Sequence, residues 1–185
     1  MNRKSWQFTV ALPVVASVLA LPFVLSRLPG LGLAQVPLGV LVGAGEFGVA
    51  GLLSTVVVSL ADRDQVGEHN WLAITRSPLL RPYRAIADRF PLPAVLGLFA
   101  LVAVATEFFA RAVVAGLLGG VPAVVVSIGI SCALWTVTAG TWRTARLGLV
   151  AGAVTGLVHG ILFVHTGQLA PLAAATLTFL ALAVL

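Results

Sequence analysis

The stretch ATEFFARAV, residues 105–113, places a carboxylate and a guanidinium inside a run that is otherwise apolar. Glu107 and Arg111 are four residues apart, so in a helix they share one face, with the acid first, as a helical ion pair prefers. A charge at the centre of a membrane-spanning helix costs about 3 kcal/mol or more, and such residues are usually paired and face the bundle interior. The stretch therefore predicts either a structural ion pair or part of a functional site.

The composition of the chain indicates that this stretch lies in a membrane. Of the 185 residues, 59% are hydrophobic and 9% are charged, whereas ordinary globular domains carry about 25% charged residues. Long apolar runs without the alternation of barrel strands predict an all-α membrane protein. The net charge of the chain is +5, which is expected of a membrane protein because its cytoplasmic loops are rich in Lys and Arg. We therefore expect the lipid bilayer as a partner and no nucleic acid.

Outward from the opening stretch, hydropathy predicts a bundle of about six transmembrane helices. Two spans fall in residues 1–60, a membrane-surface loop with an interfacial segment in 61–91, and four spans in 92–185. The expected spans are Trp6–Leu25, Leu31–Leu60, Leu92–Leu118, Val121–Gly140, Leu147–His165 and Pro171–Leu185. We expect the first to be retained rather than cleaved as a signal peptide, because its apolar run continues past the weak cleavage site. The second is so long that it must tilt, protrude or break.

The basic residues predict the orientation of this bundle. With the N-terminus in the cytoplasm, the N-terminal segment, the loop 61–91 and the loop TWRTAR (141–146) hold nine Lys and Arg residues, and the outer loops hold only Arg27. This bias favours a cell-membrane protein whose N-terminus and Arg-rich loop are cytoplasmic. The loop also mixes Leu, Ile, Trp and Tyr with its arginines, which is typical of a segment that lies on the membrane surface.

Three more ionisable residues fall inside the predicted spans. Glu46 has no partner in its own helix, so it could pair with Arg111 across helices, be protonated, or line a wet cavity. His159 and His165 are six residues apart and point in directions roughly 240° apart on a regular helix, so they cannot bind one metal together. The chain contains no GxxxxGK[ST], GxSxG, CxxC or HExxH pattern. We therefore predict no metal and no cofactor.

The order of these features, from about Leu92 to Leu182, resembles the core of the CPBP family. These are the CAAX-protease and bacteriocin-processing membrane endopeptidases, also called Abi proteins, with EExxxR in one span, FxxxH in the next and HxxxN or HxxxD in the last. TEFFAR (106–111) resembles the first motif with threonine in place of the first glutamate. SCALWTVTA (131–139) resembles the second motif, with Trp135 for the aromatic residue and Ala139 for the histidine. The histidine of the third motif would fall near Ala175 or Thr176.

The resemblance implies a membrane endopeptidase that acts on a peptide bond in or near the membrane, with weakened or lost catalysis. In the family the first glutamate is taken to activate water, and the histidines position it and stabilise the oxyanion. Thr106 cannot act as that base, and Ala139 offers no side-chain donor. A replacement site would use Glu107 and Glu46 as the carboxylates and His159 as the donor, with Arg111 fixing Glu107.

Two alternatives remain open. The first is a non-catalytic relative of the same fold, which would bind a membrane peptide or protein as an immunity or scaffold protein. The second is a small transporter or channel, for which Glu46, the buried Arg111 and the Gly-rich second span would supply a polar pathway. If the chain is an endopeptidase, we expect its catalytic site to be formed by Glu107, Arg111, His159 and Glu46.

Overall fold

The computed structural model describes residues 5–24, 30–61, 78–114, 117–137 and 142–185, and its regular secondary structure there is helical, as predicted for an all-α protein. The α-helices are α1 (Ser5–Val24), α2 (Val36–Ala61), α4 (Arg81–Ala87), α5 (Leu92–Glu107), α6 (Gly120–Val137), α7 (Trp142–Thr166) and α8 (Ala170–Val184). Shorter helical segments are η2 (Leu33–Gln35), η5 (Pro78–Leu80) and η6 (Phe108–Val114).

Four helical segments are long and apolar enough to cross a membrane, which supports an integral membrane protein. They are Leu33–Leu60, Leu92–Arg111, Gly120–Val137 and Thr144–Thr166. Two shorter apolar helices, Val10–Pro22 and Ala170–Val184, accompany them. Their outward faces are apolar, since many Leu and Val side chains of α2, α5 and α6 are exposed on the surface of the molecule. The described helices thus have the apolar exterior that a bilayer requires.

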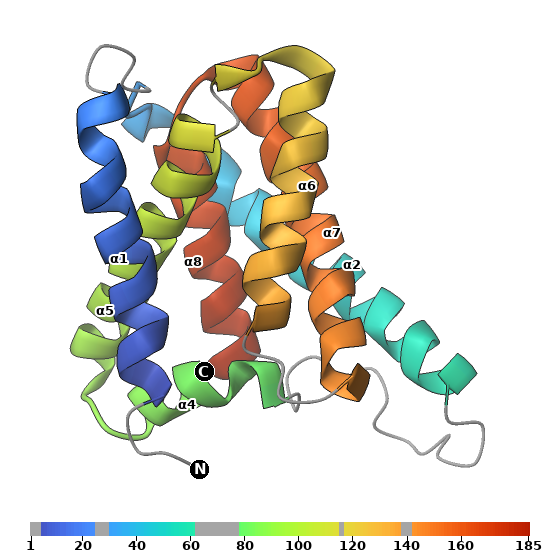
Figure 1. Cartoon of the computed structure of the whole chain (residues 1–185). Coiled ribbons are helices and arrows are strands. Elements are labelled where there is room, and N and C mark those ends of the chain that lie inside the picture. The colour runs from blue at the N-terminus through green and yellow to red at the C-terminus, as the bar shows by residue number, and fades with distance from the viewer. Residues whose placement is uncertain (1–4, 25–29, 62–77, 115–116, 138–141) are drawn as a thin grey trace.

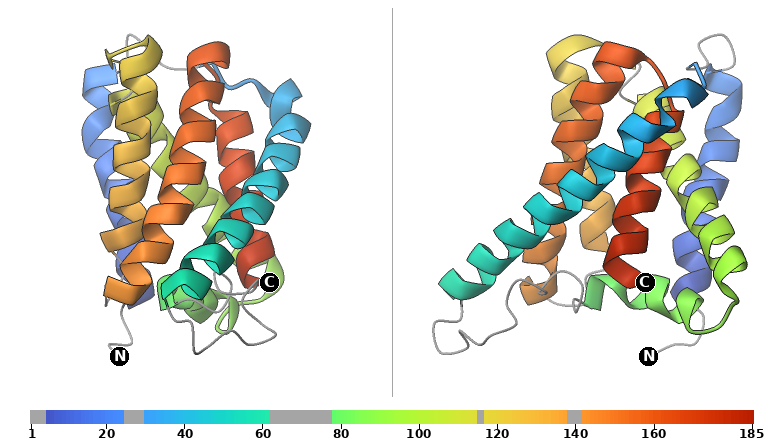
Figure 2. Two further views of the ribbon diagram at one scale, coloured as in Figure 1. Left: turned by 90° about the vertical axis from the view of Figure 1, so that its right-hand side faces the viewer. Right: turned by 180° about the vertical axis from the view of Figure 1, so that it is seen from behind.

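Helix α8 lies in the middle of the bundle, with α1 and α5 on one side and α6 and α7 on the other (Figure 1). It packs most extensively against α2 and α5, whereas the most extensive contact between any two of the described helices is that of α6 with α7. Helix α2 crosses the bundle obliquely (Figure 2). Helix α4 lies across the end of the bundle at which α1 begins and α8 ends (Figure 1).

Residues Val36–Ala61 of the long second run form one continuous helix, so the break that was one of its three expected outcomes does not occur there. The 26 residues of α2 span about 39 Å. Gly39 and Gly43 face α8, where an added Cβ would overlap the backbone carbonyls of Pro171 and Ala175. Small residues at such contacts let two helix backbones approach closely.

Helices α6 and α7 also pack closely through glycines, which recur at every fourth residue of α7. Gly148, Gly152, Gly156 and Gly160 all face α6. A Cβ at Gly152 would lie 2.5 Å from the Cα atom of Cys132, which leaves no room for any larger residue. This packing also corrects one prediction. Most of the expected loop TWRTAR is helical, because α7 already begins at Trp142.

Two turns are found where glycine supplies a positive φ. Gly119 (φ 67°) joins η6 to α6, and Gly167 (φ 60°) joins α7 to α8. The backbone of Gly30, between the first two expected spans, pairs with the second of these turns through hydrogen bonds to Gly167 and Leu169. Most of the loop 61–91, Ala139 and Arg27 lie outside the described residues.

Candidate functional site

The site begins where the helix carrying the opening stretch changes its winding. Helix α5 ends at Glu107, and the chain continues as a π-helical segment, η6, which includes Arg111. π-Helical turns are rare and occur often at functional sites. Glu107 and Arg111 nevertheless stay close, with Arg111 Nε 3.3 Å from Glu107 Oε2. The predicted ion pair is therefore confirmed, although its geometry is not that of a hydrogen bond for either atom.

A histidine joins two carboxylates in the interior of the bundle. The Nδ1 atom of His159, on α7, lies 3.0 Å from Glu107 Oε1. Its Nε2 atom lies 3.0 Å from Glu46 Oε2, on α2. The exposed fractions of the three residues are 0% for His159 and 3% for each glutamate. Three of the four predicted site residues thus meet directly, and Glu46 pairs with His159 rather than with Arg111.

The two contacts on His159 determine how much charge the cluster carries. Each hydrogen bond needs one proton, so the two bonds need two protons shared among one imidazole and two carboxyl groups. Either the imidazole holds both and each carboxylate is ionised, or the imidazole is neutral and one carboxyl group is protonated. Both arrangements leave one negative charge on the three residues. The guanidinium of Arg111 balances it, so the cluster as a whole is neutral, as a buried site in a membrane requires.

Hydroxyl groups on α6 and α8 complete the cluster. Thr176 donates a hydrogen bond to Glu107 Oε1 at 2.8 Å. Arg111 donates to the hydroxyl of Ser131 at 2.8 Å and to the carbonyl of Ser127 at 3.4 Å. Sequence reasoning missed these two serines as partners of Arg111. The signal was available, because they are four residues apart in an apolar helix and so share one face.

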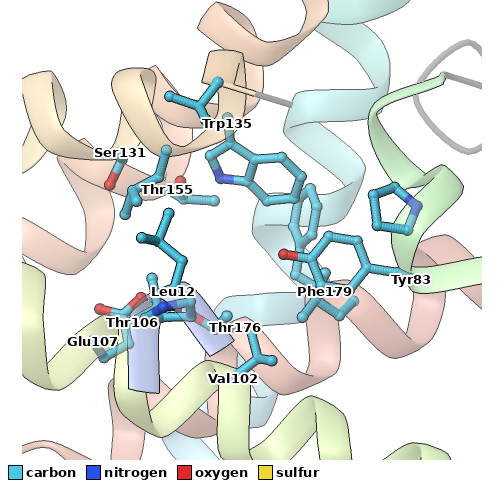
Figure 3. A pocket seen from close by; sticks show the side chains of 15 residues that line it. Leu12, Tyr83, Val102, Thr106, Glu107, Ser131, Trp135, Thr155, Thr176 and Phe179 are labelled. Carbon is cyan, nitrogen blue, oxygen red and sulfur yellow. Dashed lines mark hydrogen bonds between the residues drawn. The ribbon is translucent and has the colours of Figure 1, made fainter. Parts of the chain in front are cut away.

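A cavity of about 340 Å³ adjoins the cluster. Glu107 lies in its wall beside the hydroxyl residues Thr106, Ser131, Thr155 and Thr176. In Figure 3, Thr106, Glu107 and Thr176 lie on one side of this space, and Tyr83 and Phe179 lie on the other. The rest of the wall is apolar apart from the hydroxyl of Tyr83 and the indole N–H of Trp135, and it comes from α1, α4, α5, α6 and α8. A carboxylate at the wall of an apolar cavity can take a proton from a bound molecule or hold a polar group of a ligand.

The structure also shows which predicted positions stay outside the cluster. His165 is exposed and its Nδ1 atom contacts the carbonyl of Ile161 at 2.9 Å, so the prediction that the two histidines point apart is confirmed. In the described part of the chain, no group of three or more His, Cys, Asp or Glu side chains is placed to hold a metal ion. Glu46, His159 and Glu107 do not form such a group, because the two carboxylates contact opposite nitrogens of the His159 ring.

Three residues that were compared with the CPBP motifs in the sequence, Thr106, Trp135 and Thr176, line the cavity. Thr106 lies in the cavity wall next to Glu107, and Thr176 donates to Glu107 itself. Trp135 also lines the cavity and packs edge-on against Phe179, with ring centroids 5.4 Å apart. Comparison with protein-family models, with curated proteins and with solved structures gave no match to this chain. Function therefore has to be argued from the site.

Proposed function

We propose that this chain is a CPBP-like intramembrane endopeptidase-type protein, in which Glu107, His159 and Glu46 stand in for the residues missing from the family motifs. The observation that carries the proposal is the His159 bridge: its two nitrogens lie 3.0 Å from Glu107 and 3.0 Å from Glu46, and Glu107 faces the cavity. Acid–base groups from separate helices, gathered beside a space that can hold a substrate, are the arrangement that hydrolysis in a membrane needs.

In the proposed reaction, Glu107 is the general base. It takes a proton from a water molecule in the cavity, and the oxygen of that water forms a bond to the carbonyl carbon of the peptide. The C–N bond then breaks, the proton passes from Glu107 to the leaving nitrogen, and the products are a carboxylic acid and an amine. His159 and Glu46 hold the protonation state of Glu107, while Arg111 keeps the cluster neutral. Catalysis is weak in this proposal because Thr106 cannot supply a second carboxylate.

Two features of Glu107 support its assignment as the base. Its Oε1 atom is held by His159 and Thr176, which fixes the carboxylate. Its Oε2 atom is buried, accepts no hydrogen bond among the described residues and has only the charge contact with Arg111. An oriented carboxylate with one oxygen free to accept a proton is what a general base requires.

Isotope transfer from water tests the proposal. The purified protein in lipid nanodiscs is incubated in H₂¹⁸O with a mixture of apolar peptides, and mass spectrometry detects new carboxyl groups that carry ¹⁸O. We expect wild-type protein to produce labelled fragments and Glu107→Gln to abolish them. Asp88→Asn is the matched control, since Asp88 is an exposed acid outside the site, and it should leave the yield unchanged. Equal labelling by the Glu107→Gln protein would overturn the proposal.

One observation favours a second function, a non-catalytic binding protein of the same fold. The cluster is neutral, and each of its four charged or ionisable side chains makes at least one hydrogen bond within it, as in a structural core. In that case the cavity binds a membrane peptide and no labelled fragment appears with any peptide. A transporter is the remaining alternative, and it would instead give a flux of ions or solute across vesicles that Glu46→Gln abolishes.

The topology belongs to the same proposal. We propose six spans in the cell membrane, with the N-terminus and the Arg-rich loop 61–91 in the cytoplasm and α4 at the membrane surface. The support is the distribution of Lys and Arg, together with six apolar helices in the described residues. Cysteines introduced at Ser5 and at Gly119 in a Cys132→Ala background should react with a membrane-impermeant thiol reagent from opposite sides of the membrane. Labelling of both from the same side would contradict this topology.

A further inference from the structure

Several hydrogen-bond donors that line the cavity beside Glu107 have no acceptor among the described residues. Among the described residues, the hydroxyls of Thr106 and Tyr83 and the indole N–H of Trp135 have no hydrogen-bond partner, yet all three residues line the cavity. The hydroxyl of Tyr83 points into the space (Figure 3). All three residues are partly buried and line the cavity. A few polar groups that converge on an apolar pocket fix the orientation of its ligand, so these donors indicate where a ligand would place its acceptors.

The charge of the cluster excludes a charged ligand. Glu107 is the one ionisable group of the cluster that lies in the cavity wall, and its charge is already balanced by Arg111 and the shared protons of His159. Burial also raises the pKa of Tyr83 to about 12, so this phenol is a neutral donor at physiological pH. A ligand in this cavity meets donors and apolar surface and no uncompensated charge, so an ionic group on it would pay the cost of desolvation.

The apolar part of the wall comes from several helices and reaches the outer surface between α1 and α6. Leu12 on α1 and Val137 on α6 both line the cavity, and they are 58% and 73% exposed. Helix α1 packs against α5, η6 and α4, with no comparable packing against α6. The mouth of the cavity thus lies between two apolar helices, and a molecule dissolved in the bilayer can reach Glu107 without crossing a polar surface.

We propose that the cavity binds two or three uncharged, apolar residues of an extended peptide, which enter from the bilayer between α1 and α6 and place backbone carbonyls against Tyr83, Trp135 and Thr106. The donors come from α4, α6 and α5 and surround the space, which suits the repeated acceptors of a peptide backbone better than the single ester group of an acyl chain. The volume of about 340 Å³ falls at the small end of ligand pockets, which limits the bound length. The inference deepens the proposed function and rests on it for what happens after binding.

Fluorescence of Trp135 tests this binding directly. Replacing Trp6, Trp71 and Trp142 by Phe leaves Trp135 as the one tryptophan of a nanodisc-embedded chain. The probe is an uncharged acetyl-leucyl-(4-bromophenylalanyl)-leucine amide, whose bromine quenches a neighbouring indole. We expect saturable quenching. Moving the tryptophan to the lipid-exposed position Leu101, in a chain that lacks the others, should give only the gradual quenching of a peptide dissolved in the bilayer.

Two variants test the recognition and the route. Tyr83→Phe removes one donor and should weaken the affinity about fivefold, which is the effect of one hydrogen bond of ordinary strength. Leu12→Phe narrows the mouth and should slow binding at least tenfold. Its matched control, Leu19→Phe, changes another exposed leucine of α1 that lies outside the cavity wall, and it should bind as wild type does. Analogues with an Asp in place of one leucine, and a chain-brominated fatty-acid methyl ester, should bind at least tenfold more weakly than the neutral peptide.

Several outcomes would overturn the inference. They are the absence of saturable quenching, equal affinity of the wild-type and Tyr83→Phe proteins, equal rates for Leu12→Phe and Leu19→Phe, and tighter binding of the ester or of the charged peptide. Failure of the proposed function looks different. Saturable quenching without ¹⁸O incorporation would leave the binding site standing and refute hydrolysis, whereas labelled fragments without saturable quenching would leave hydrolysis standing and refute this site.

Discussion

Replacing Arg111 by methionine should destabilise the protein strongly, and a second substitution should restore part of the loss. Arg111 is 1% exposed and contacts Glu107, Ser131 and the backbone of Ser127. Methionine keeps most of its volume but removes the positive charge, which leaves a net negative charge in the bundle. Removing one partner of a buried ion pair typically costs about 3–5 kcal/mol, and for a chain of this size that corresponds to a loss of roughly 10 °C in the midpoint of thermal unfolding.

The informative comparison is with Glu107→Gln, alone and in combination. Glu107→Gln alone leaves the cluster with a net positive charge and should also destabilise the protein. The double variant is neutral again, so the two effects should fall short of additive by about 2 kcal/mol, within the range known for residues in direct contact. Arg89→Met is the control, because Arg89 is exposed; it should change the midpoint by no more than a degree or two for an effect of about 0.5 kcal/mol.

The chain supplies its own probe for this assay. Cys132 is its single cysteine and is partly buried between α6 and α7, so a thiol-reactive fluorophore reports the loss of that contact on heating in detergent. All variants must be heated at the same rate, because unfolding of such a protein need not be reversible. Additive losses in the double variant would refute the reasoning, since they would mean that Arg111 and Glu107 do not balance one another.

Three further predictions concern separate parts of the molecule. Thr176→Val removes the hydroxyl that donates to Glu107 Oε1 while keeping the side-chain shape, so it should cost about 1–2 kcal/mol, measured as the unfolding midpoint; an unchanged midpoint would contradict this bond. Gly152→Ala should destabilise the α6–α7 pair by more than 1 kcal/mol, as expected of overpacking, whereas Gly97→Ala, which has open space around it, should be neutral or slightly stabilising; equal effects would disprove the close contact. Burial raises the pKa of Tyr83 from 10.0 to about 12, so the folded state holds this proton more tightly. Its contribution to stability is complete below pH 10 and is lost as the pH rises through 12, and an alkaline unfolding curve should show this loss in wild type and not in Tyr83→Phe.

Much of the helical architecture could be predicted from the sequence because hydropathy determines it. The apolar runs and the glycine turns at 119 and 167 follow from composition alone, and the helices begin and end within a few residues of the expected positions. The loop TWRTAR was the exception, because polarity indicates where a helix meets water and does not say where the helix ends. The bounds of α7 depend on its packing against α6 through Gly148 and Gly152.

The residues of the site could be predicted from the sequence, but the contacts between them could not. Ionisable residues inside apolar runs are costly and are usually paired. The sequence therefore indicates that four residues need a polar partner inside the bundle: Glu46, Glu107, Arg111 and His159. Which residue pairs with which depends on the tilt of α2 and on the winding of η6, and neither leaves a clear pattern in one sequence. For this reason Glu46 could equally be assigned to Arg111 before its contact with His159 was known. Thr176 and the serines of α6 were missed because hydroxyl residues are common in packed membrane helices.

The most direct test of the central claim, that His159 bridges Glu46 and Glu107, is a distance measured by solid-state NMR in lipid bilayers. Protein labelled with ¹⁵N in the histidine ring and ¹³C in the glutamate carboxyl carbon contains three residues of each type, and subtracting the spectrum of His159→Gln isolates the ring of interest. Contacts of 3.0 Å from both ring nitrogens to carboxylate oxygens predict strong dipolar coupling of each nitrogen to a carboxyl carbon. That coupling should fall on one nitrogen in Glu46→Gln and on the other in Glu107→Gln protein labelled in the same way. The absence of coupling to either nitrogen would contradict the bridge, and with it the neutral cluster and the proposed site.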